Sequence, residues 1–273
     1  MRDDLPTAGE GRAEGADETR REHAQREPAA TSEYDRIATL YDPWSRSVVE
    51  DVAFYVDESR KAAGRAGVDP STPVVELGVG TGRIAVPVAS AGISVIGVDR
   101  SPGMVDVCRR RAETAGVSGR LDLRVGDFRS PPVTERVGLV MCPFRAYLHL
   151  PDDDGERVDA LRAAHDLLVP GGRLAFDVFA PSPDDIAETH GRWIEREPGI
   201  WERATWDDAA RRLTLDVRGH GVETTLRLTW LPTAQWPSLL ERAGFEVDAC
   251  YGWFDRRPYS GGEDTIWVAR LSS

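Results

Sequence analysis

Short apolar runs and amphipathic segments alternate along the middle of the chain. The apolar runs have the length of strands and occupy residues 73–77, 94–98, 121–125, 137–142 and 172–179. Between them apolar residues recur at helical spacing. Ser101-Pro102 supplies a favourable N-cap and first residue for one of these helices, and Pro170-Gly171-Gly172 predicts the turn into the last of these strands. The alternation predicts βαβ units, in which helices cover both faces of a parallel sheet.

The pattern changes after Ala180. Between about 190 and 231, apolar and polar residues alternate singly with turn residues between the runs, which is typical of antiparallel strands. A helical pattern at 233–243 ends at a glycine, and two further strand patterns lie at 245–252 and 264–270. The predicted fold class is therefore α/β: a Rossmann-like, doubly wound sheet of seven strands with an antiparallel β extension after the fifth strand.

Composition divides the chain into three segments. Residues 1–32 are rich in charged and small residues and nearly lack large apolar ones, so we predict a disordered acidic tail. Residues 33–72 predict a short and a longer amphipathic helix with a break at Pro43. Residues 73–273 hold the predicted sheet together with its antiparallel extension.

The charge balance restricts the partners. The chain carries 46 acidic residues against 34 Lys and Arg residues, a formal net charge of −12, and a negative field repels nucleic-acid backbones. We find no apolar run of membrane-spanning length and no signal-peptide core, and the three cysteines are far apart. We expect a cytoplasmic protein that acts on a small molecule, with neither nucleic acid nor membrane as a partner.

A glycine loop joins the first predicted strand to the helix that follows it. Gly78, Gly80 and Gly82 come after Glu76, at the carboxyl end of a strand, where open α/β sheets bind ligands. Asp99 ends the next strand, where an acid can bind both hydroxyls of a ribose. The loop therefore predicts an adenosine-like ligand. A dinucleotide is one alternative, although the spacing is GxGxG rather than GxGxxG, and a tight turn without a ligand is another.

Five segments resemble, in order and spacing, the motifs of the class I S-adenosylmethionine-dependent methyltransferases. They read ELGVGTG, VIGVDRS, VGDFRSPP, GLVMCPFRAYLHL and LVPGGRLAFDVF. The resemblance covers about residues 34–180 and implies S-adenosyl-L-methionine as the cofactor. It assigns Asp99 to the ribose, Asp127 to the adenine amino group and Phe128 to a position beside the adenine ring.

The resemblance also implies a lid and a wider set of cofactor-binding residues. In this family the N-terminal helices form a lid, which here would be residues 33–72. The implied cofactor-binding residues are Tyr34, Tyr41, Arg46, Glu76, Gly78, Val79, Gly80, Asp99, Arg100, Met104, Gly126, Asp127, Phe128 and Cys142. Val79 departs from the pattern because many members have Cys or Ala there. Arg46 either holds the carboxylate of the cofactor or is a surface arginine, and the aromatic residues of the lid either form the wall of the site or belong to the core.

The loop after the fourth predicted strand faces the transferred methyl group in this family. His149 is our candidate base because its ordinary pKa lies near working pH; the alternative is that it only packs or hydrogen-bonds beside the cofactor. Arg145 either binds a carboxylate or phosphate of the substrate or pairs with a surface acid. The candidate substrate-binding residues are Trp44, Arg145 and Tyr147, and we predict no metal site.

The sequence thus predicts an enzyme that transfers a methyl group from S-adenosyl-L-methionine to nitrogen or oxygen of a small metabolite or natural product. Two alternatives stay open, a catalytically silent S-adenosylmethionine-binding module and an aminopropyltransferase on the same fold. The segment after residue 180 resembles the extension of small-molecule methyltransferases, including amino-sugar N-methyltransferases. Its tryptophans either line a substrate cavity, form the face of a homodimer or only pack within the fold.

Overall fold

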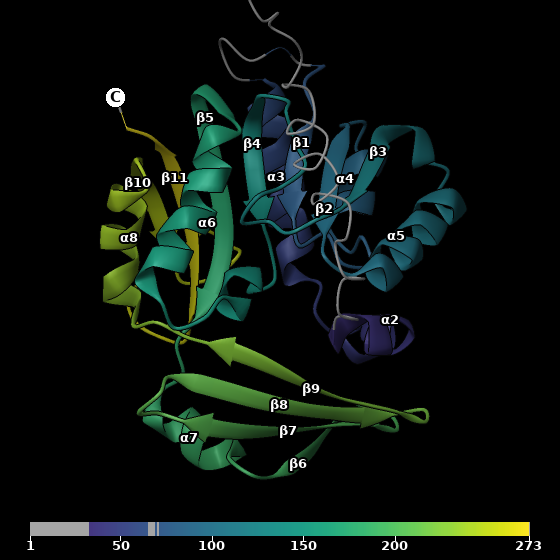
Figure 1. The fold of residues 1–273 in the computed structure, drawn as a ribbon, viewed down its shortest axis with the longest axis vertical. Coiled ribbons are helices and arrows are strands. Elements are labelled where there is room, and N and C mark those ends of the chain that lie inside the picture. Colours follow the sequence, from purple (N-terminus) through teal and green to yellow (C-terminus); the bar gives the residue numbers. More distant parts are fainter. Residues whose placement is uncertain (1–32, 65–68, 70, 273) are drawn as a thin grey trace, which may run out of the picture. The chain divides into compact units, whose positions relative to one another are not determined.

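A computed structural model describes residues 33–64, 69 and 71–272. The predicted disorder of residues 1–32 lies outside these residues. The described part of the chain forms two β-sheets, one of seven strands and one of four, with helices packed on them (Figure 1). None of the helices in this part is long and apolar enough to cross a membrane.

The larger sheet has the strand order β10-β11-β5-β4-β1-β2-β3. Its strands are β1 Val74–Leu77, β2 Val95–Asp99, β3 Leu121–Val125, β4 Val137–Cys142, β5 Leu168–Phe179, β10 Phe245–Tyr251 and β11 Asp264–Leu271. Strands β1 to β5 run parallel, whereas β11 is antiparallel to both of its neighbours. The chain builds outward from β1 in both directions, so the order reverses between β1 and β4, where such sheets bind ligands. The predicted doubly wound fold is confirmed.

Helices cover both faces of this sheet. They are α3 Glu50–Ala63, α4 Ala85–Ser90, α5 Pro102–Thr114, α6 Asp154–Asp166 and α8 Trp236–Arg242. Two further helices pack on the smaller sheet: α7 Pro183–Thr189, and α2 Glu33–Trp44, which also contacts α5. Helices α3, α4 and α5 share a core cluster with Leu139 and Met141 of β4, whereas α6 and α8 pack in the cluster that contains Val140. Adjacent residues of a strand point to opposite faces. Burial from both sides explains why β4 is a continuous apolar run in the sequence.

Local signals in the sequence fix where the helices begin. The Ser101 hydroxyl accepts a hydrogen bond from the Met104 N–H at 3.1 Å, and Pro102 is the first residue of α5. Asp153 caps α6 by accepting the Gly155 N–H at 2.7 Å. These caps hold the loops that precede the helices, and those loops form part of the pocket described below.

Two boundaries differ from the prediction. Pro43 lies inside the last turn of α2 instead of in a break between helices. The last parallel strand begins earlier than predicted: β5 starts at Leu168, so Pro170-Gly171-Gly172 lies inside the strand instead of before it, with Gly171 at a φ angle of 78°. The ladder between β4 and β5 shifts register after Val137, so the extra residues are accommodated as a bulge.

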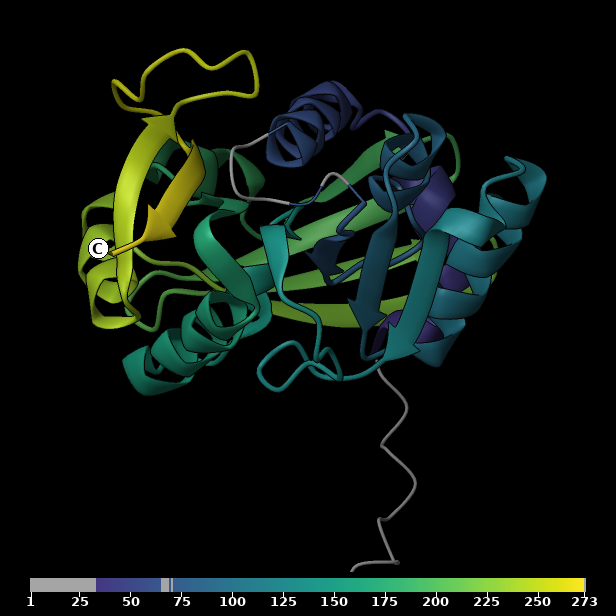
Figure 2. The same cartoon turned by 90° about the horizontal axis from the view of Figure 1, so that it is seen from above.

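The smaller sheet is the predicted antiparallel extension. Its strands, in sheet order, are β6 Trp193–Glu197, β7 Ile200–Asp207, β8 Arg212–Gly219 and β9 Val222–Thr229. Strand β9 contacts α2 and the short 3₁₀ helix η2 (Ala146–His149), which follows β4. The extension therefore lies across the end of the larger sheet at which β4 finishes (Figures 1 and 2).

Candidate active site

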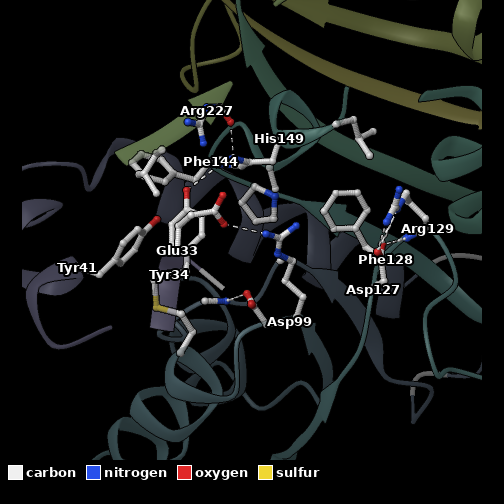
Figure 3. A pocket seen from close by; sticks show the side chains of 18 of the residues that line it. Glu33, Tyr34, Tyr41, Asp99, Asp127, Phe128, Arg129, Phe144, His149 and Arg227 are labelled. Carbon is white, nitrogen blue, oxygen red and sulfur yellow. Dashed lines mark hydrogen bonds and ion pairs between the residues drawn. The ribbon is translucent and has the colours of Figure 1, made fainter. Parts of the chain in front are cut away.

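A pocket of about 290 Å³ opens where the strand order reverses, between the end of the larger sheet and the extension (Figure 3). It is formed by α2, the loops after β1, β2, β3 and β4, and the edge strand β9. The predicted residues that it brings together are Tyr34, Tyr41, Gly78, Gly80, Asp99, Arg100, Met104, Asp127, Phe128 and His149. It adds lining residues that sequence analysis missed, namely Glu33, Arg129, Pro143, Phe144, Ala146, Leu150, Pro151, Leu226 and Arg227.

The glycine loop after β1 has a backbone conformation that residues with side chains rarely adopt. Gly78 and Gly80 have φ angles of 75° and 53°, in the left-handed region that favours glycine. A Cβ atom on Gly78 would lie 3.1 Å from the Cβ atom of Ala146, so a side chain there would press on the loop after β4. The two glycines therefore keep the backbone of the loop open to a ligand.

The carboxylate of Asp99 is fixed by the backbone yet can still accept hydrogen bonds. Its Oδ2 accepts the Gly80 N–H and its Oδ1 accepts the Ser101 N–H, each at 2.8 Å. An ionised carboxylate can accept about four hydrogen bonds. Asp99 lines the pocket, so its remaining acceptor capacity fits the paired hydroxyls of a ribose (Figure 3).

Glu76 lies under the glycine loop with an unsatisfied acceptor. The side chain is buried, and its Oε2 has no hydrogen-bond partner among the described residues. Burial raises the pKa of the Glu76 carboxyl, which the positive charge of Arg83 partly offsets. A buried acceptor without a donor is costly. Glu76 therefore fits a ligand that brings a donor such as an ammonium group, although its side chain does not line the pocket.

The loop after β3 brings an acid and an aromatic ring to the pocket. The Arg129 guanidinium holds the Asp127 carboxylate through Nη2 at 2.6 Å and also pairs with Glu156 at 2.8 Å. Phe128 packs edge-to-face on the buried Tyr147, with ring centroids 5.8 Å apart. An acceptor fixed beside an apolar ring face suits a flat heterocycle that carries an amino group.

Tyr34 and His149 form a hydrogen-bonded pair on the opposite wall. The Nδ1 atom of His149 lies 3.1 Å from the carbonyl oxygen of Arg227, which can only accept, so this nitrogen carries the proton. The Nε2 atom therefore accepts the hydrogen bond from the Tyr34 hydroxyl, 2.7 Å away. The chain Tyr34–His149–Arg227 joins α2, η2 and β9 at one point of the pocket (Figure 3).

The environment of His149 changes its acid–base properties. Burial lowers the pKa of His149 to about 4, helped by the charge of Arg100 and opposed by the hydrogen bond to Arg227. The expectation of a pKa near neutral pH is therefore wrong for this site. Burial also raises the pKa of Tyr34 far above its ordinary value, so both groups are neutral at physiological pH.

Aromatic side chains surround this pair. Tyr41 packs edge-to-face with Tyr34 at 6.0 Å and with Phe144 at 6.3 Å between ring centroids. Tyr41 and Tyr34 belong to α2, whereas Phe144 comes from the loop after β4. The guanidinium of Arg83 lies 4.6 Å from the centroid of the Phe144 ring. The rings of Tyr34, Tyr41 and Phe144 thus lie together in the part of the pocket next to His149.

Other predicted cofactor-binding residues lie outside the pocket lining. Val79 is buried and packs against Gly97, and Cys142 is buried at the end of β4. Gly126 follows β3, while Arg46 is exposed after α2. Of these, Val79 and Cys142 support the loops that do line the pocket.

The three candidate substrate-binding residues are also outside the lining. Trp44 donates its Nε1–H to Glu202 at 3.0 Å, which joins α2 to β7. Tyr147 is buried. Arg145 pairs with Asp264 at 2.8 Å, which corresponds to the second of the two alternatives given for it. Substrate contacts by these residues stay predictions.

Some of the lining residues that sequence analysis missed lie in segments that the sequence already marked, and others do not. Arg129 and Phe144 lie within recognised motifs, so the sequence indicated that their segments are close to the cofactor. Leu226 and Arg227 lie on β9 in an ordinary alternating strand, and only the packing of the extension on η2 brings them to the pocket. Within the described ranges no group of three His, Cys, Asp or Glu side chains is arranged to hold a metal ion.

Comparison with known proteins agrees with this geometry. Residues 74–172 match the family model of a methyltransferase domain. An uncharacterized methyltransferase of Geobacillus kaustophilus is 31% identical over 189 residues, covering 67% of this chain and 79% of the relative. The cypemycin N-terminal methyltransferase of a Streptomyces species is 25% identical over 243 residues, covering 85% and 91%.

A solved structure resembles the whole described fold. The CcbJ methyltransferase from Streptomyces caelestis superposes with a TM-score of 0.76 at 27% identity, covering 89% of this chain and 99% of the other. A doubly wound sheet with a glycine loop at its switch point and a ribose-type acid at the end of the next strand defines a protein that binds an adenosine-containing cofactor. The chain belongs to the S-adenosylmethionine-dependent methyltransferases, and its cofactor is S-adenosyl-L-methionine.

Proposed function

We propose that this enzyme methylates a nitrogen atom of a small natural product. The observation that carries the proposal is the neutral pair at the pocket, in which the Tyr34 hydroxyl donates to Nε2 of His149 at 2.7 Å. The family membership supports methyl transfer as the reaction, and the pair supports an amine as the acceptor.

We propose that the cofactor is held by the loops after the first three strands of the sheet. Asp99 would bind the ribose hydroxyls, Asp127 and Phe128 would bind the adenine, and Glu76 below the Gly78 loop would take the ammonium of the methionine portion. The unused acceptors of Asp99 and the orphaned Oε2 of Glu76 support this assignment. Bound there, S-adenosyl-L-methionine supplies an activated methyl group.

The weak basicity of His149 favours a nitrogen acceptor over a hydroxyl. A group whose pKa is about 4 cannot remove a proton from an alcohol at a useful rate, because the proton transfer is strongly uphill. A neutral amine already has a lone pair and needs only to be oriented. The Tyr34 oxygen, whose proton is directed to His149, can accept an N–H hydrogen bond from such an amine.

The aromatic groups next to the pair support the same conclusion. Methylation turns a neutral amine into a cation, and aromatic faces attract cations. Tyr34, Tyr41 and Phe144 surround the place where this charge would form. A histidine that stays neutral adds no opposing positive charge. One relative is named as an N-terminal methyltransferase, a name consistent with an amine acceptor.

The remaining expectations about partners stay proposals. We propose a small-molecule acceptor, no nucleic-acid partner, a cytoplasmic location and a homodimer through the extension. Trp201 on β7 is an exposed large apolar side chain of this sheet, and the guanidinium groups of Arg203 and Arg218 both lie within 4.9 Å of the centroid of the Trp193 ring on β6. Sedimentation of the full chain at several concentrations tests the dimer, and a single monomeric species would contradict it.

Matched pairs of amines and alcohols test the choice of acceptor atom. The purified enzyme is incubated with deuteromethyl-labelled cofactor and with natural-product fragments that differ only in carrying an amine or a hydroxyl at one position. Mass spectrometry should find the labelled methyl group on the amine member of a pair. Transfer to the hydroxyl member alone would contradict nitrogen methylation, and transfer to neither by an enzyme that binds S-adenosylhomocysteine would contradict the acceptor class.

A further inference from the structure

Asp177 is a buried acid near the carboxyl end of β5, and it does not line the pocket. Its Oδ1 accepts hydrogen bonds from the Tyr55 hydroxyl at 2.6 Å and from the Phe144 N–H at 2.8 Å. Its Oδ2 accepts the Arg145 N–H at 3.1 Å. A single side chain therefore binds two successive backbone N–H groups of the loop after β4, and these bonds offset the desolvation of the carboxylate.

The loop that Asp177 binds has an unusual backbone. Phe144 and Arg145 have φ angles of 55° and 63°, in the left-handed region that residues with a side chain seldom adopt. Neither residue is glycine or asparagine. Strain of this kind persists only where the surrounding structure fixes it. The hydrogen bonds from both N–H groups to Asp177 provide that fixation.

The same loop carries the groups that face the acceptor. Phe144 lines the pocket next to Tyr41, and η2 begins directly after Arg145 and ends at His149. A change in the backbone at Phe144 and Arg145 would turn the Phe144 ring away from Tyr41. It would also displace Nε2 of His149 from the Tyr34 hydroxyl.

We propose that Asp177 is a positioning residue for methyl transfer, which acts by holding Phe144 and Arg145 in the left-handed conformation. Its catalytic consequence rests on the proposed function, whereas the hold on the loop exists with or without an acceptor. Misplacement of a reacting group by about 1 Å can lower a rate on the order of 100-fold. Asp177 therefore controls turnover without touching either ligand.

The surroundings of Asp177 also give it a pH dependence. The titratable and charged groups around it are Asp51 and Tyr55 of α3, Cys142 of β4, Arg83 ahead of α4 and Arg145 in the loop. Strand β11 adds the apolar Ile266 as its register partner. Burial, followed by the charge of Asp51, raises the pKa of Asp177 to about 6. As the pH falls through this value, the carboxylate gains a proton and becomes a weaker acceptor for the two loop N–H groups.

Hydrogen exchange of Asp177→Asn tests the hold on the loop directly. The amide keeps the volume but replaces one acceptor oxygen by a donor, which cannot bind a second N–H. We expect faster exchange in the peptide that spans residues 143–150, turnover lowered about tenfold to 100-fold, and S-adenosylhomocysteine affinity within about threefold of wild type. Below about pH 6 the wild-type rate should fall more steeply than protonation of the amine alone predicts, and this additional fall should disappear with the carboxylate.

Tyr55→Phe is the matched control for Asp177→Asn, because it tests whether a general loss of stability around Asp177 is enough to change the loop. It removes the third hydrogen bond to Asp177 but leaves both loop N–H bonds in place. We expect a lower melting temperature with the exchange of residues 143–150 unchanged. Equal loop exchange in both variants would mean that Asp177 only stabilises the core, and would overturn the proposal.

Two substitutions at position 145 distinguish the effect of backbone strain from the effect of losing the arginine side chain. Arg145→Gly and Arg145→Ala both remove the ion pair with Asp264, but only glycine relieves the strain at φ 63°. In the Asp177→Asn background, the glycine variant should recover loop protection relative to the alanine variant. Equal protection in both would overturn the proposal. The exchange readout needs no acceptor, so its result stands even when no methylated product is found.

Discussion

The hydroxyl of Tyr34 and Nε2 of His149 are 2.7 Å apart although 115 positions separate the two residues in the chain. Because His149 uses Nδ1–H to bind the carbonyl of Arg227, its free lone pair points at Tyr34. Helix α2, the loop after β4 and the extension thus meet in one hydrogen-bonded chain. All three elements line the pocket, so α2 belongs to the acceptor site that we propose.

Removal of either member of this pair should slow methyl transfer. Tyr34→Phe deletes only the hydroxyl, and we expect turnover about tenfold lower or more, because the amine loses the oxygen that orients it. His149→Ala should have a similar effect while cofactor affinity changes little. Since the two groups act as a unit, the double variant should be no slower than the slower single one. Multiplied effects, measured in single-turnover assays, would mean that they act independently.

Asp99→Ala should weaken binding of the product cofactor. Loss of hydrogen bonds to two ribose hydroxyls predicts at least tenfold lower affinity for S-adenosylhomocysteine, or about 1.4 kcal/mol, by calorimetry. Asp106→Ala is a suitable control, because Asp106 is an exposed acid on α5 that pairs with Arg109 away from the pocket. Equal affinities in the two variants would contradict the ribose assignment.

Gly82→Ala should destabilise the fold more than Gly92→Ala. Both glycines have positive φ, 79° and 93°, so alanine strains the backbone at either position. A Cβ atom on Gly82 would also lie 2.5 Å from the sulfur of the buried Cys108, whereas one on Gly92 meets nothing within 4 Å. We expect the free energy of unfolding to fall by about 1–3 kcal/mol more for Gly82→Ala, measured by urea titration. Equal losses would mean that Cys108 moves aside freely.

The pH dependence of stability should carry a contribution from His149. Its folded pKa is about 4 against an ordinary value of 6.5, so the unfolded chain binds this proton at higher pH than the native one. The contribution of a neutral His149 is complete above pH 6.5 and is lost as the pH falls towards 4. Asp177, with its pKa raised to about 6, contributes with the opposite sign below that pH. His149→Gln should therefore flatten the fall in unfolding free energy between pH 6.5 and 4, and an unchanged slope would contradict burial of a neutral imidazole.

The sequence could predict the parts of the fold that depend on local patterns. Strands buried on both faces are continuous apolar runs, and Ser101 caps α5 because its hydroxyl reaches a nearby N–H. The start of β5 could not be predicted at Pro170-Gly171-Gly172, because Leu168 already pairs with Val137 of β4 and these residues form a bulge before the ladder resumes at Arg173. Pairing with a distant strand leaves no mark in a local pattern.

In the candidate site, too, only the residues that follow a local pattern could be predicted. Asp99 and the Gly78 loop follow strands of a recognisable unit, so their place at the sheet edge could be inferred. Phe144 enters the pocket through a left-handed backbone held by Asp177, 33 positions away, and Arg227 enters through the packing of β9. The low pKa of His149 likewise depends on burial by elements that are remote in the sequence.

The most direct test of the central claim is the pH dependence of single-turnover methyl transfer to a series of related amines. In this account Tyr34 and His149 are neutral and only orient the acceptor, so the amine has to arrive without its extra proton. Between pH 7 and 10 the rate should rise with a midpoint that follows the pKa of each amine in turn. A midpoint that stays at one pH for all amines, and that disappears in His149→Ala, would show an ionising base on the enzyme and contradict the account.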